Sequence, residues 1–438
     1  ASPDARTPQA SPDASPPQEV ADTLRLSVEE AVRRAVTVNE NVLIARAERA
    51  AAEGQIKQVR SGALPQISAN FGYTRNIQTP VIFFNTDEGV EQIQVGSDND
   101  YTMGLSLSQT VFDFSLGPAR TAARLGREAT GAQVESARTQ VALGARSAYY
   151  DVLLSQRLVE VQEQALEQAQ RRLSQVEDFH RAGTASEFDL LTAQVEVDNL
   201  RPPLIEARNE LSLRRDRLKR TAGIPLERTV VVTDSFPVPE GADPDRELDA
   251  YVEQALRQRP DLRAQRIRVD LQEENLTAQE RDALPTLELV AGLQRQASSS
   301  DLLPPERDFT QSASAGLNFS IPLFDGLARS GQVQQATAER DREQFRRDQL
   351  REDIRLEVEQ ALQALNAARE RIEASAANVS RAERALEIAQ SRFRNGLSTQ
   401  VELNDAELAV TEARTNRARA LHAYSIARAQ LLASTGER

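Results

Sequence analysis

The sequence predicts a mainly α-helical protein that also contributes strands to a membrane β-barrel. Three observations support this fold class. Aromatic residues make up only 4% of the 438 residues and Cys and Trp are absent, a composition typical of long helices and coiled coils. Apolar residues recur every seven positions through two long segments. Four shorter segments alternate apolar with polar residues, which is the period of a strand with one apolar face.

The charge and the reactive residues exclude several functional classes. Lys and Arg number 53 against 66 Asp and Glu, and the net charge of −13 disfavours a nucleic-acid partner. Two His and no Cys argue against a metal site and against thiol chemistry. The sequence contains no Gly-rich phosphate loop and no nucleophile with a base at motif spacing. We therefore expect no enzymatic activity, no cofactor and no bound metal.

A tandem duplication organises the chain. Ala63-Leu64-Pro65 recurs as Ala283-Leu284-Pro285, and Arg181-Ala182-Gly183 recurs as Arg394-Asn395-Gly396. In both cases the second copy follows the first by about half the length of the chain. We therefore expect a first repeat at 23–225, a link at 226–245 and a second repeat at 246–438. Residues 1–22 are rich in Pro, Ser, Ala and Asp, and they predict a disordered tether.

Each repeat opens with one helix, predicted at 27–61 and at 246–281. Ser27 and Glu30 have the spacing of a capping box, in which each residue satisfies a backbone donor of the other. Pro65 and Pro285 end these helices, because proline lacks the backbone N–H and crowds the preceding turn.

Two strands follow in each repeat, at 66–75 and 101–112 and at 286–296 and 309–322. In the first strand Ile67, Ala69, Phe71 and Tyr73 alternate with polar or small residues. No apolar run approaches the roughly 18–20 residues of a transmembrane helix, so strands are the candidates for membrane contact. The segments between paired strands, 76–100 and 297–308, are long and polar, as are loops on the outer side of a barrel.

A very long helix and a shorter returning helix complete each repeat, at 117–180 and 187–222 and at 327–393 and 399–434. The apolar residues of the long helices lie seven apart and predict left-handed coiled coils; they are Val152, Val159, Leu166 and Leu173 in the first repeat and Leu365, Ile372, Val379 and Leu386 in the second. Pro202-Pro203 predicts a kink or break in the first returning helix.

The lengths of these elements predict how they assemble. The two shorter helices of a repeat, stacked end to end, match the long helix and give a wall of uniform height, with strands at one end and Gly turns at the other. An open four-stranded sheet would expose unsatisfied backbone groups to lipid, and barrel closure needs at least about eight strands. Several copies of the chain are therefore expected to close one barrel.

The order of these parts resembles the TolC family of outer-membrane efflux proteins, over residues 23–436. Strings typical of that family are Arg259-Pro260-Asp261-Leu262, Ala283-Leu284-Pro285 and Leu323-Phe324-Asp325-Gly326. The resemblance implies a homotrimer in outer-membrane lipid of a Gram-negative-type cell, with a 12-stranded β-barrel above an α-barrel tunnel through the periplasm. It implies a passive exit duct of a tripartite efflux pump or secretion system, recruited by a periplasmic adaptor (membrane fusion) protein and an inner-membrane transporter.

The two Gly turns are the candidate docking tips. Gly is suited to the left-handed conformation that ends a helix, and Ser186 with Asp189 and Thr399 with Glu402 predict capping boxes that start the next one. The resemblance implies that the adaptor grips these tips; the candidate contacts are Arg181, Gly183 and Ser186 in the first and Arg394, Gly396 and Thr399 in the second.

The resemblance also implies a tunnel entrance lined by acidic residues six and nine positions after the second Gly, here Glu402 and Asp405. In the first repeat Asp189 fills the sixth position, and Thr192 fills the ninth. Where some members carry an Arg two positions after the second Gly, this chain has Ser398. Three copies of two carboxylates in one narrow ring predict a cation-selective entrance that multivalent cations block.

Two alternatives remain open at this point. A soluble coiled-coil scaffold, whose strand pairs form a small sheet, is the main alternative of a different class. Within the family, type I protein secretion, metal efflux and drug efflux are not separated by the sequence, because the pump chooses the cargo.

Overall fold

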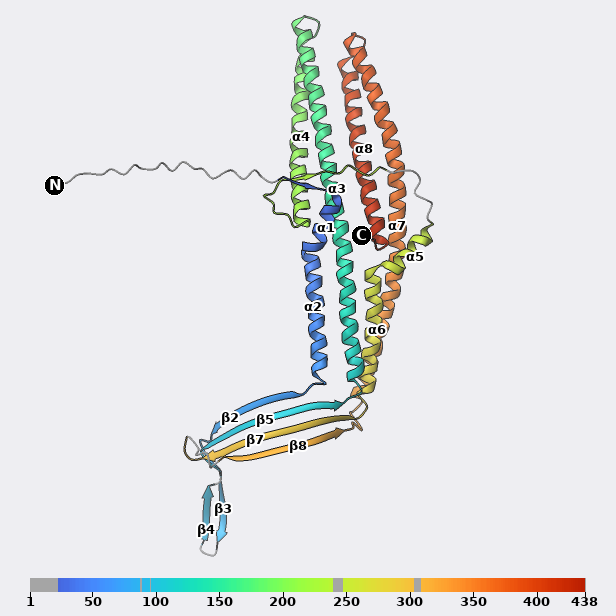
Figure 1. Ribbon diagram of the computed structural model, residues 1–438. Coiled ribbons are helices and arrows are strands. Elements are labelled where there is room, and N and C mark those ends of the chain that lie inside the picture. Colours follow the sequence, from blue (N-terminus) through green and yellow to red (C-terminus); the bar gives the residue numbers. More distant parts are fainter. Residues whose placement is uncertain (1–22, 87–88, 95, 239–246, 303–308, 438) are drawn as a thin grey trace, which may run out of the picture.

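The long helices stand side by side as a rod, and a four-stranded sheet lies across one end of it (Figure 1). This arrangement comes from a computed structural model, which describes residues 23–86, 89–94, 96–238, 247–302 and 309–437. The predicted tether at 1–22 lies outside the described residues, as do residues 239–245 of the predicted link.

The two repeats contain corresponding elements in the same order. The first consists of β1 (Leu24–Leu26), α1 (Val28–Val38), α2 (Glu40–Ser61), β2 (Gln66–Arg75), β5 (Asn99–Phe112), α3 (Leu116–Arg181) and α4 (Glu187–Thr221), with the hairpin β3 (Val81–Thr86) and β4 (Gly89–Gln94) between β2 and β5. After β6 (Val230–Val232), the second consists of α5 (Leu248–Gln258), α6 (Pro260–Arg281), β7 (Thr286–Ser299), β8 (Thr310–Ser320), α7 (Ala328–Arg394) and α8 (Gln400–Ser434).

Each repeat opens with two consecutive helices in place of the single helix predicted from the sequence. Asn39 separates α1 from α2, because its backbone is extended and its side-chain oxygen accepts a hydrogen bond from the Asn41 N–H at 3.0 Å. In the second repeat Arg259 is extended and Pro260 starts α6 at its first position, where the missing N–H costs nothing. The predictions of continuous helices at 27–61 and 246–281 are therefore wrong.

Four helices lie side by side in each half of the rod. The order is α4, α3, α8, α7 toward the free tips and α2, α3, α6, α7 toward the sheet, so the long helices α3 and α7 run through both halves. Most of the seven-residue apolar positions are buried in the seams of this wall, and Leu166 and Leu173 are half-buried. Among the described residues, no helix combines the length and apolar character that a membrane span requires.

Of the kink or break predicted at Pro202-Pro203, the break does not occur, because α4 continues through both residues from Glu187 to Thr221. Val197, Leu204 and Leu218 are buried on the side of α4 that packs against α3. Packing along one face holds the helix together although two backbone donors are missing, since tertiary contacts supply most of the stability of a helix in a protein.

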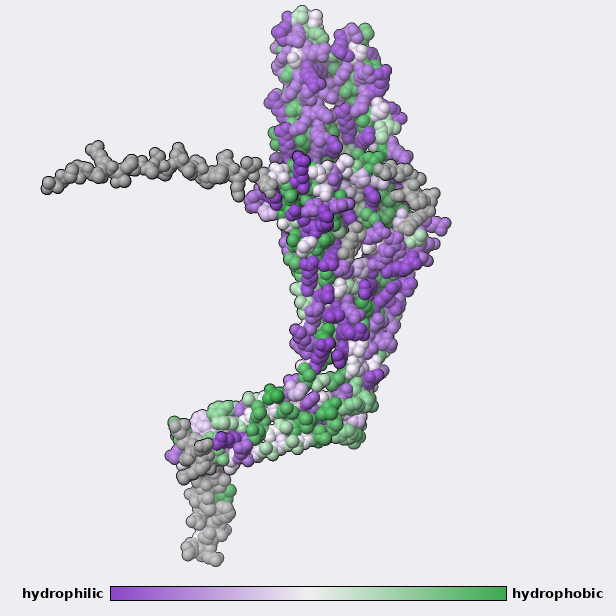
Figure 2. Space-filling view, viewed as in Figure 1, coloured by the Kyte–Doolittle hydropathy of each residue, from purple (hydrophilic) through white to green (hydrophobic). Residues whose placement is uncertain are grey.

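The main sheet is antiparallel in the order β2-β5-β7-β8, so β2 and β8 are its edges. The strand register aligns apolar residues on one face: Phe71 opposes Met103, and Leu289 opposes Leu317. The other face is polar or small, with Ser68 opposite Ser106. Figure 2 shows the contrast between this largely hydrophobic sheet and the hydrophilic helical rod.

A second hairpin replaces part of the polar loop predicted at 76–100. β3 and β4 pair antiparallel, with Val81 opposite Gln94 at one end and Thr86 opposite Gly89 at the other. The hairpin extends beyond the end of the main sheet (Figure 1). Val81, Ile82 and Phe83 are apolar and favour a strand, and Gly89, which begins β4, has a positive φ of 130°, a conformation that favours glycine.

An equatorial segment, which consists of β1, β6 and residues 233–236, crosses the middle of the rod. β1 and β6 form a parallel pair, and the Tyr149 hydroxyl of α3 donates to the Leu26 carbonyl at 3.0 Å while accepting from the Asp234 N–H at 3.0 Å. Tyr150 stacks on Phe236, with ring centroids 6.3 Å apart. These contacts fix one face of α3 as the face that the equatorial segment covers.

Candidate functional site: the helical tips and the tunnel entrance

Both tips end their long helices with the same backbone motif. Gly183 has φ 75° and Gly396 has φ 70°, and neither would place a Cβ within 4 Å of another residue, so the conformation itself demands glycine. In the first tip the Thr184 N–H donates to the Phe179 carbonyl at 2.9 Å, and in the second the Leu397 N–H donates to the Arg392 carbonyl at 2.9 Å. These bonds are Schellman motifs, which satisfy the last carbonyls of a helix.

The two caps that follow the glycines differ. Ser186 and Asp189 form a complete capping box: the Asp189 N–H donates to Ser186 Oγ at 3.2 Å, and the Ser186 N–H donates to the Asp189 carboxylate at 3.0 Å. Hydrogen bonds from the Ser186 side chain and backbone lower the pKa of Asp189 below its usual value.

In the second tip only half of the predicted box forms. Thr399 Oγ1 accepts from the Glu402 N–H at 3.3 Å, but the Glu402 carboxylate accepts a hydrogen bond from Ser398 instead of returning to Thr399. The Arg392 guanidinium lies 3.9 Å from the same carboxylate. Ser398, the position where the sequence departs from some relatives, therefore holds Glu402.

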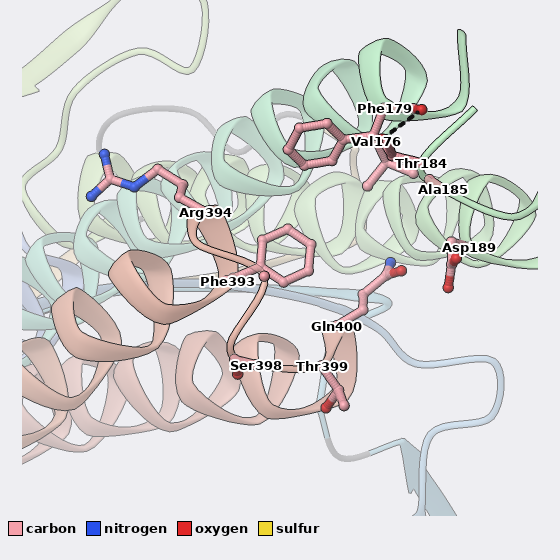
Figure 3. A pocket seen from close by; sticks show the side chains of 11 residues that line it. Val176, Phe179, Thr184, Ala185, Asp189, Phe393, Arg394, Ser398, Thr399 and Gln400 are labelled. Carbon is pink, nitrogen blue, oxygen red and sulfur yellow. Dashed lines mark hydrogen bonds between the residues drawn. The ribbon is translucent and has the colours of Figure 1, made fainter. Parts of the chain in front are cut away.

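A cavity of about 550 Å³ lies between the two tips (Figure 3). Its lining brings together Asp189 from α4 with Arg394, Gly396 and Thr399 from the second tip. The side chains of Phe179 and Phe393 add an aromatic surface from α3 and α7. Of the other predicted site residues, Arg181 is exposed and paired with Asp178, and Gly183, Ser186, Glu402 and Asp405 are not among the lining residues.

The wall has two distinguishable faces near the tips. The Arg414 guanidinium of α8 donates to the Gln164 side chain of α3 at 2.6 Å, and Gln164 lies about four turns from Tyr150, which contacts the equatorial segment. Arg414 therefore marks the face that the equatorial segment covers. Asp405 lies nine residues, about two and a half turns, from Arg414, so it projects from the opposite face, and Glu402 lies one turn from Asp405.

A buried charge cluster near the tips was not predicted from the sequence. Arg172 of α3, only 3% exposed, forms ion pairs with Glu196 of α4 and Glu407 of α8. Burial raises the pKa of Glu407 above its usual value although the Arg172 charge acts in the opposite direction. The cluster joins three helices from both hairpins. No sequence signal distinguishes these charges from the many that lie on solvated helix faces.

A second polar contact joins the two hairpins near the equator. His422 Nε2 of α8 lies 2.8 Å from Asp151 Oδ1 of α3, and the Arg214 guanidinium of α4 lies 3.0 Å from the other carboxylate oxygen. Burial alone would raise the pKa of Asp151, but its hydrogen bonds and charge interactions with His422 and Arg214 outweigh burial and lower it. Among the described residues, no group of three or more His, Asp or Glu side chains is arranged to hold a metal ion.

A family model with the description "Outer membrane efflux protein" matches residues 31–223 and again residues 251–437. The chain belongs to the outer membrane efflux protein family. The two matches fall one in each half of the chain, in agreement with the repeated order of its elements. As a member of this family, the chain is an outer-membrane exit duct for efflux or secretion that extends into the periplasm, and the hypothesis of a soluble scaffold is set aside.

Individual relatives agree with this membership. The chain is 26% identical over 313 residues to Protein CyaE of Bordetella pertussis, an alignment that covers 70% of this chain and 65% of CyaE. It is 23% identical over 403 residues to the outer membrane protein TolC of Escherichia coli, covering 89% of this chain and 78% of TolC. Among solved structures, the Campylobacter jejuni CmeC outer membrane channel superposes with a TM-score of 0.77 at 18% identity, covering 99% of this chain and 94% of that one.

Proposed function

We propose that three copies of this chain close into one duct, with twelve strands forming a β-barrel and twelve helices forming a tunnel at each level of the rod. The single observation that carries this proposal is the pair of unpaired sheet edges, β2 and β8, on a sheet with one mostly apolar face. Open edges in lipid leave backbone groups without partners, and pairing β8 of one copy with β2 of the next removes every edge.

The helical wall has complementary open sides. On α4 the residues that face α3, such as Ala193 and Val197, are buried. Leu191 and Val195 lie two residues away, about 200° around the helix, and are 52% and 57% exposed. An exposed apolar stripe on an outermost helix fits the helix of a neighbouring copy, here α7, which is the outermost helix at the other side of the wall.

The tips are the docking surface for the adaptor protein, which links the duct to an inner-membrane transporter. The cavity between the tips supports this assignment, because it offers the exposed Arg394 and the aromatic rings of Phe179 and Phe393 beside rigidly capped turns. Arg181 and Gly183 with Ser186 form the rim of the first tip, and Gly396 with Thr399 form the rim of the second. The transporter supplies the energy and chooses the cargo.

Glu402 and Asp405 form the tunnel entrance, with Asp189 beside it. Both carboxylates lie on the face of α8 opposite the equatorial segment, which in a closed tube is the inner face, because the bulk of three equatorial segments fits only outside. Three copies place six carboxylates around one axis. Like charges held together attract cations, so the duct conducts cations in preference to anions and multivalent cations block it.

Ion selectivity in planar bilayers tests this entrance. In a KCl gradient the reversal potential of the Glu402→Ala plus Asp405→Ala variant moves toward zero, and block by a trivalent cation weakens at least tenfold. The matched control removes two exposed carboxylates, Glu160 and Glu167, which lie about three and five turns from Tyr149 on the equatorial face of α3. Unchanged selectivity in the entrance variant, or an equal change in the control, would overturn the assignment.

A further inference from the structure

A basic groove lies between α7 and α8, on the shafts of the second hairpin below its tip. Its volume is about 610 Å³, and no Asp or Glu lines it. Its polar lining consists of Arg371, Ser375, Asn378, Arg381, Asn416 and Arg419. Alanines make up the rest of the lining, so the groove exists because the side chains in the seam between the two helices are small at this height.

The three arginines of this groove are not engaged by carboxylates. Arg371, Arg381 and Arg419 are exposed, and none forms an ion pair with another described residue. On the same shafts, Arg384 pairs with Glu387 and Arg414 pairs with Glu383. The chain has a net charge of −13, but three guanidinium groups without carboxylate partners make this groove locally positive.

The position of the groove on α8 places it on the inner face. Asn416 and Ala423 lie two and nine residues from Arg414, about 200° and 180° around the helix from the residue that marks the equatorial face. Asp405, Glu412 and Arg419 lie at seven-residue intervals, so all three project on one stripe. The groove therefore shares its face with the entrance carboxylates.

The contacts of α7 lead to the same face independently. In the second repeat α5 takes the place of α1, whose Ala31 packs in the same cluster as Leu26 of the equatorial segment. Arg355 of α7 lies 3.3 Å from Asp249 of α5, and Leu362 lies seven residues further along α7. The stripe that they define continues to Arg369. Arg371 lies two residues from that stripe, about 200° around the helix, and Asn378 and Arg381 follow at seven and ten residues from Arg371.

We propose that this groove is a binding site for multivalent oxyanions, carboxylate- or phosphate-bearing, on the inner wall of the tunnel; its inner location rests on the proposed trimeric duct. Guanidinium groups bind carboxylate and phosphate through paired hydrogen bonds, and the Asn and Ser side chains supply further donors. Arg381 and Arg371 lie about 22 and 38 Å below Gly396, at roughly 1.5 Å per residue. Anionic cargo that has passed the acidic entrance thus meets a band of positive charge, where low-affinity binding concentrates it.

Inorganic pyrophosphate is the probe. Titration calorimetry on the detergent-solubilised full chain measures its binding at low salt, and bilayer recordings measure its block of current. In the Arg371→Gln, Arg381→Gln, Arg419→Gln variant, binding weakens at least tenfold and the block is lost. The unfolding temperature stays within a few degrees, since all three side chains are exposed.

The control variant changes the same charge on the opposite face. Arg355→Gln, Arg369→Gln and Arg428→Gln remove three positive charges from α7 and α8 on the equatorial side, since Arg428 lies about four turns from Arg414 along α8. This control binds pyrophosphate within twofold of the unsubstituted chain.

The two kinds of measurement separate the groove from the duct. The proposal that the groove binds oxyanions is overturned if the unsubstituted chain does not bind pyrophosphate, or if binding weakens equally in both variants. If pyrophosphate binding depends on the groove arginines but the protein forms no channels, the binding site is supported and the proposed trimeric duct is wrong. Binding with no effect on the current of a functional channel overturns the placement on the inner wall.

Discussion

At the scale of the residue, the positions where helices end could be predicted from the sequence, but the hydrogen-bond partners of individual side chains could not. Gly183 and Gly396 could be recognised from sequence as helix ends, because the left-handed conformation excludes most other residues. Sequence spacing alone did not decide whether a capping pair forms. Glu30 has box spacing with Ser27, yet its carboxylate bonds to Arg33 and Arg34, and Glu402 bonds to Ser398. A side chain with several possible partners chooses by geometry that only the folded chain supplies.

The buried Arg172 gives a prediction at this scale. Replacement by Met leaves Glu407 and Glu196 in a half-buried site without their cation, and removing one partner of a buried pair costs about 3 kcal/mol. The unfolding temperature at neutral pH therefore falls. Adding Glu196→Gln and Glu407→Gln to Arg172→Met restores most of the loss, as measured by thermal unfolding in detergent.

Acidification is expected to rescue the single variant. Without Arg172, the pKa of Glu407, already raised by burial, rises further above its value in the unfolded chain. A carboxyl with a raised pKa in the fold penalises stability above that pKa, and the penalty disappears as pH falls and the group is protonated. An unfolding temperature of Arg172→Met that does not recover toward that of the unsubstituted chain between pH 7 and pH 4.5 would show that charge burial is not the cause.

At the scale of the element, long periodic patterns were reliable and breaks were not. The seven-residue spacing identified α3 and α7 because it extends over many turns. The break at Asn39 was missed, since Asn can both sit within a helix and cap the next one. A kink or break was predicted at Pro202-Pro203, and no break occurs, because packing against α3 outweighs the lost donors. The hairpin β3–β4 was not predicted, because most of the segment 76–100 that contains it is polar.

The unequal caps of α4 and α8 give a prediction at this scale. Ser186→Ala removes the hydroxyl that accepts from the Asp189 N–H and donates to the Asp189 carboxylate, and it costs the first turn of α4 about 1 kcal/mol, although the backbone N–H of residue 186 can still donate to Asp189. Thr399→Ala removes a single bond and costs less. Hydrogen exchange at the amide of Asp189 therefore accelerates roughly fivefold in the first variant. Equal acceleration of the two tips in their respective variants would contradict this difference.

At the scale of the whole molecule, a single chain leaves both edges of its main sheet and both sides of its helical wall without partners. Its sheet ends in two open edges, and its helical wall ends in α4 on one side and α7 on the other. The resemblance of motif order led to the family, and the family match over both halves confirmed it. The closure itself remains a proposal that rests on those open edges.

The mass of the detergent-extracted complex, corrected for bound detergent, tests closure directly. Light scattering is expected to give three times the chain mass of 48.4 kDa. Leu191→Glu with Val195→Glu places charges on the exposed apolar stripe of α4 and shifts the measured mass toward that of a single chain. Gln194→Glu, which adds charge at an exposed polar position, leaves the trimer intact. A monomer in the unsubstituted protein would defeat the trimeric duct.

The sequence by itself determined the duplication, the long helices, the strand pairs and the glycine turns. Each of these depends on interactions between near neighbours or on a period that repeats along the chain. The tertiary structure decided which distant charges meet: Arg172 with Glu196 and Glu407, Asp151 with His422, and the groove arginines with one another. It also decided which face of the wall is covered by the equatorial segment. A helix presents charge in every direction, and only the packing of its neighbours determines which direction is buried and which is exposed.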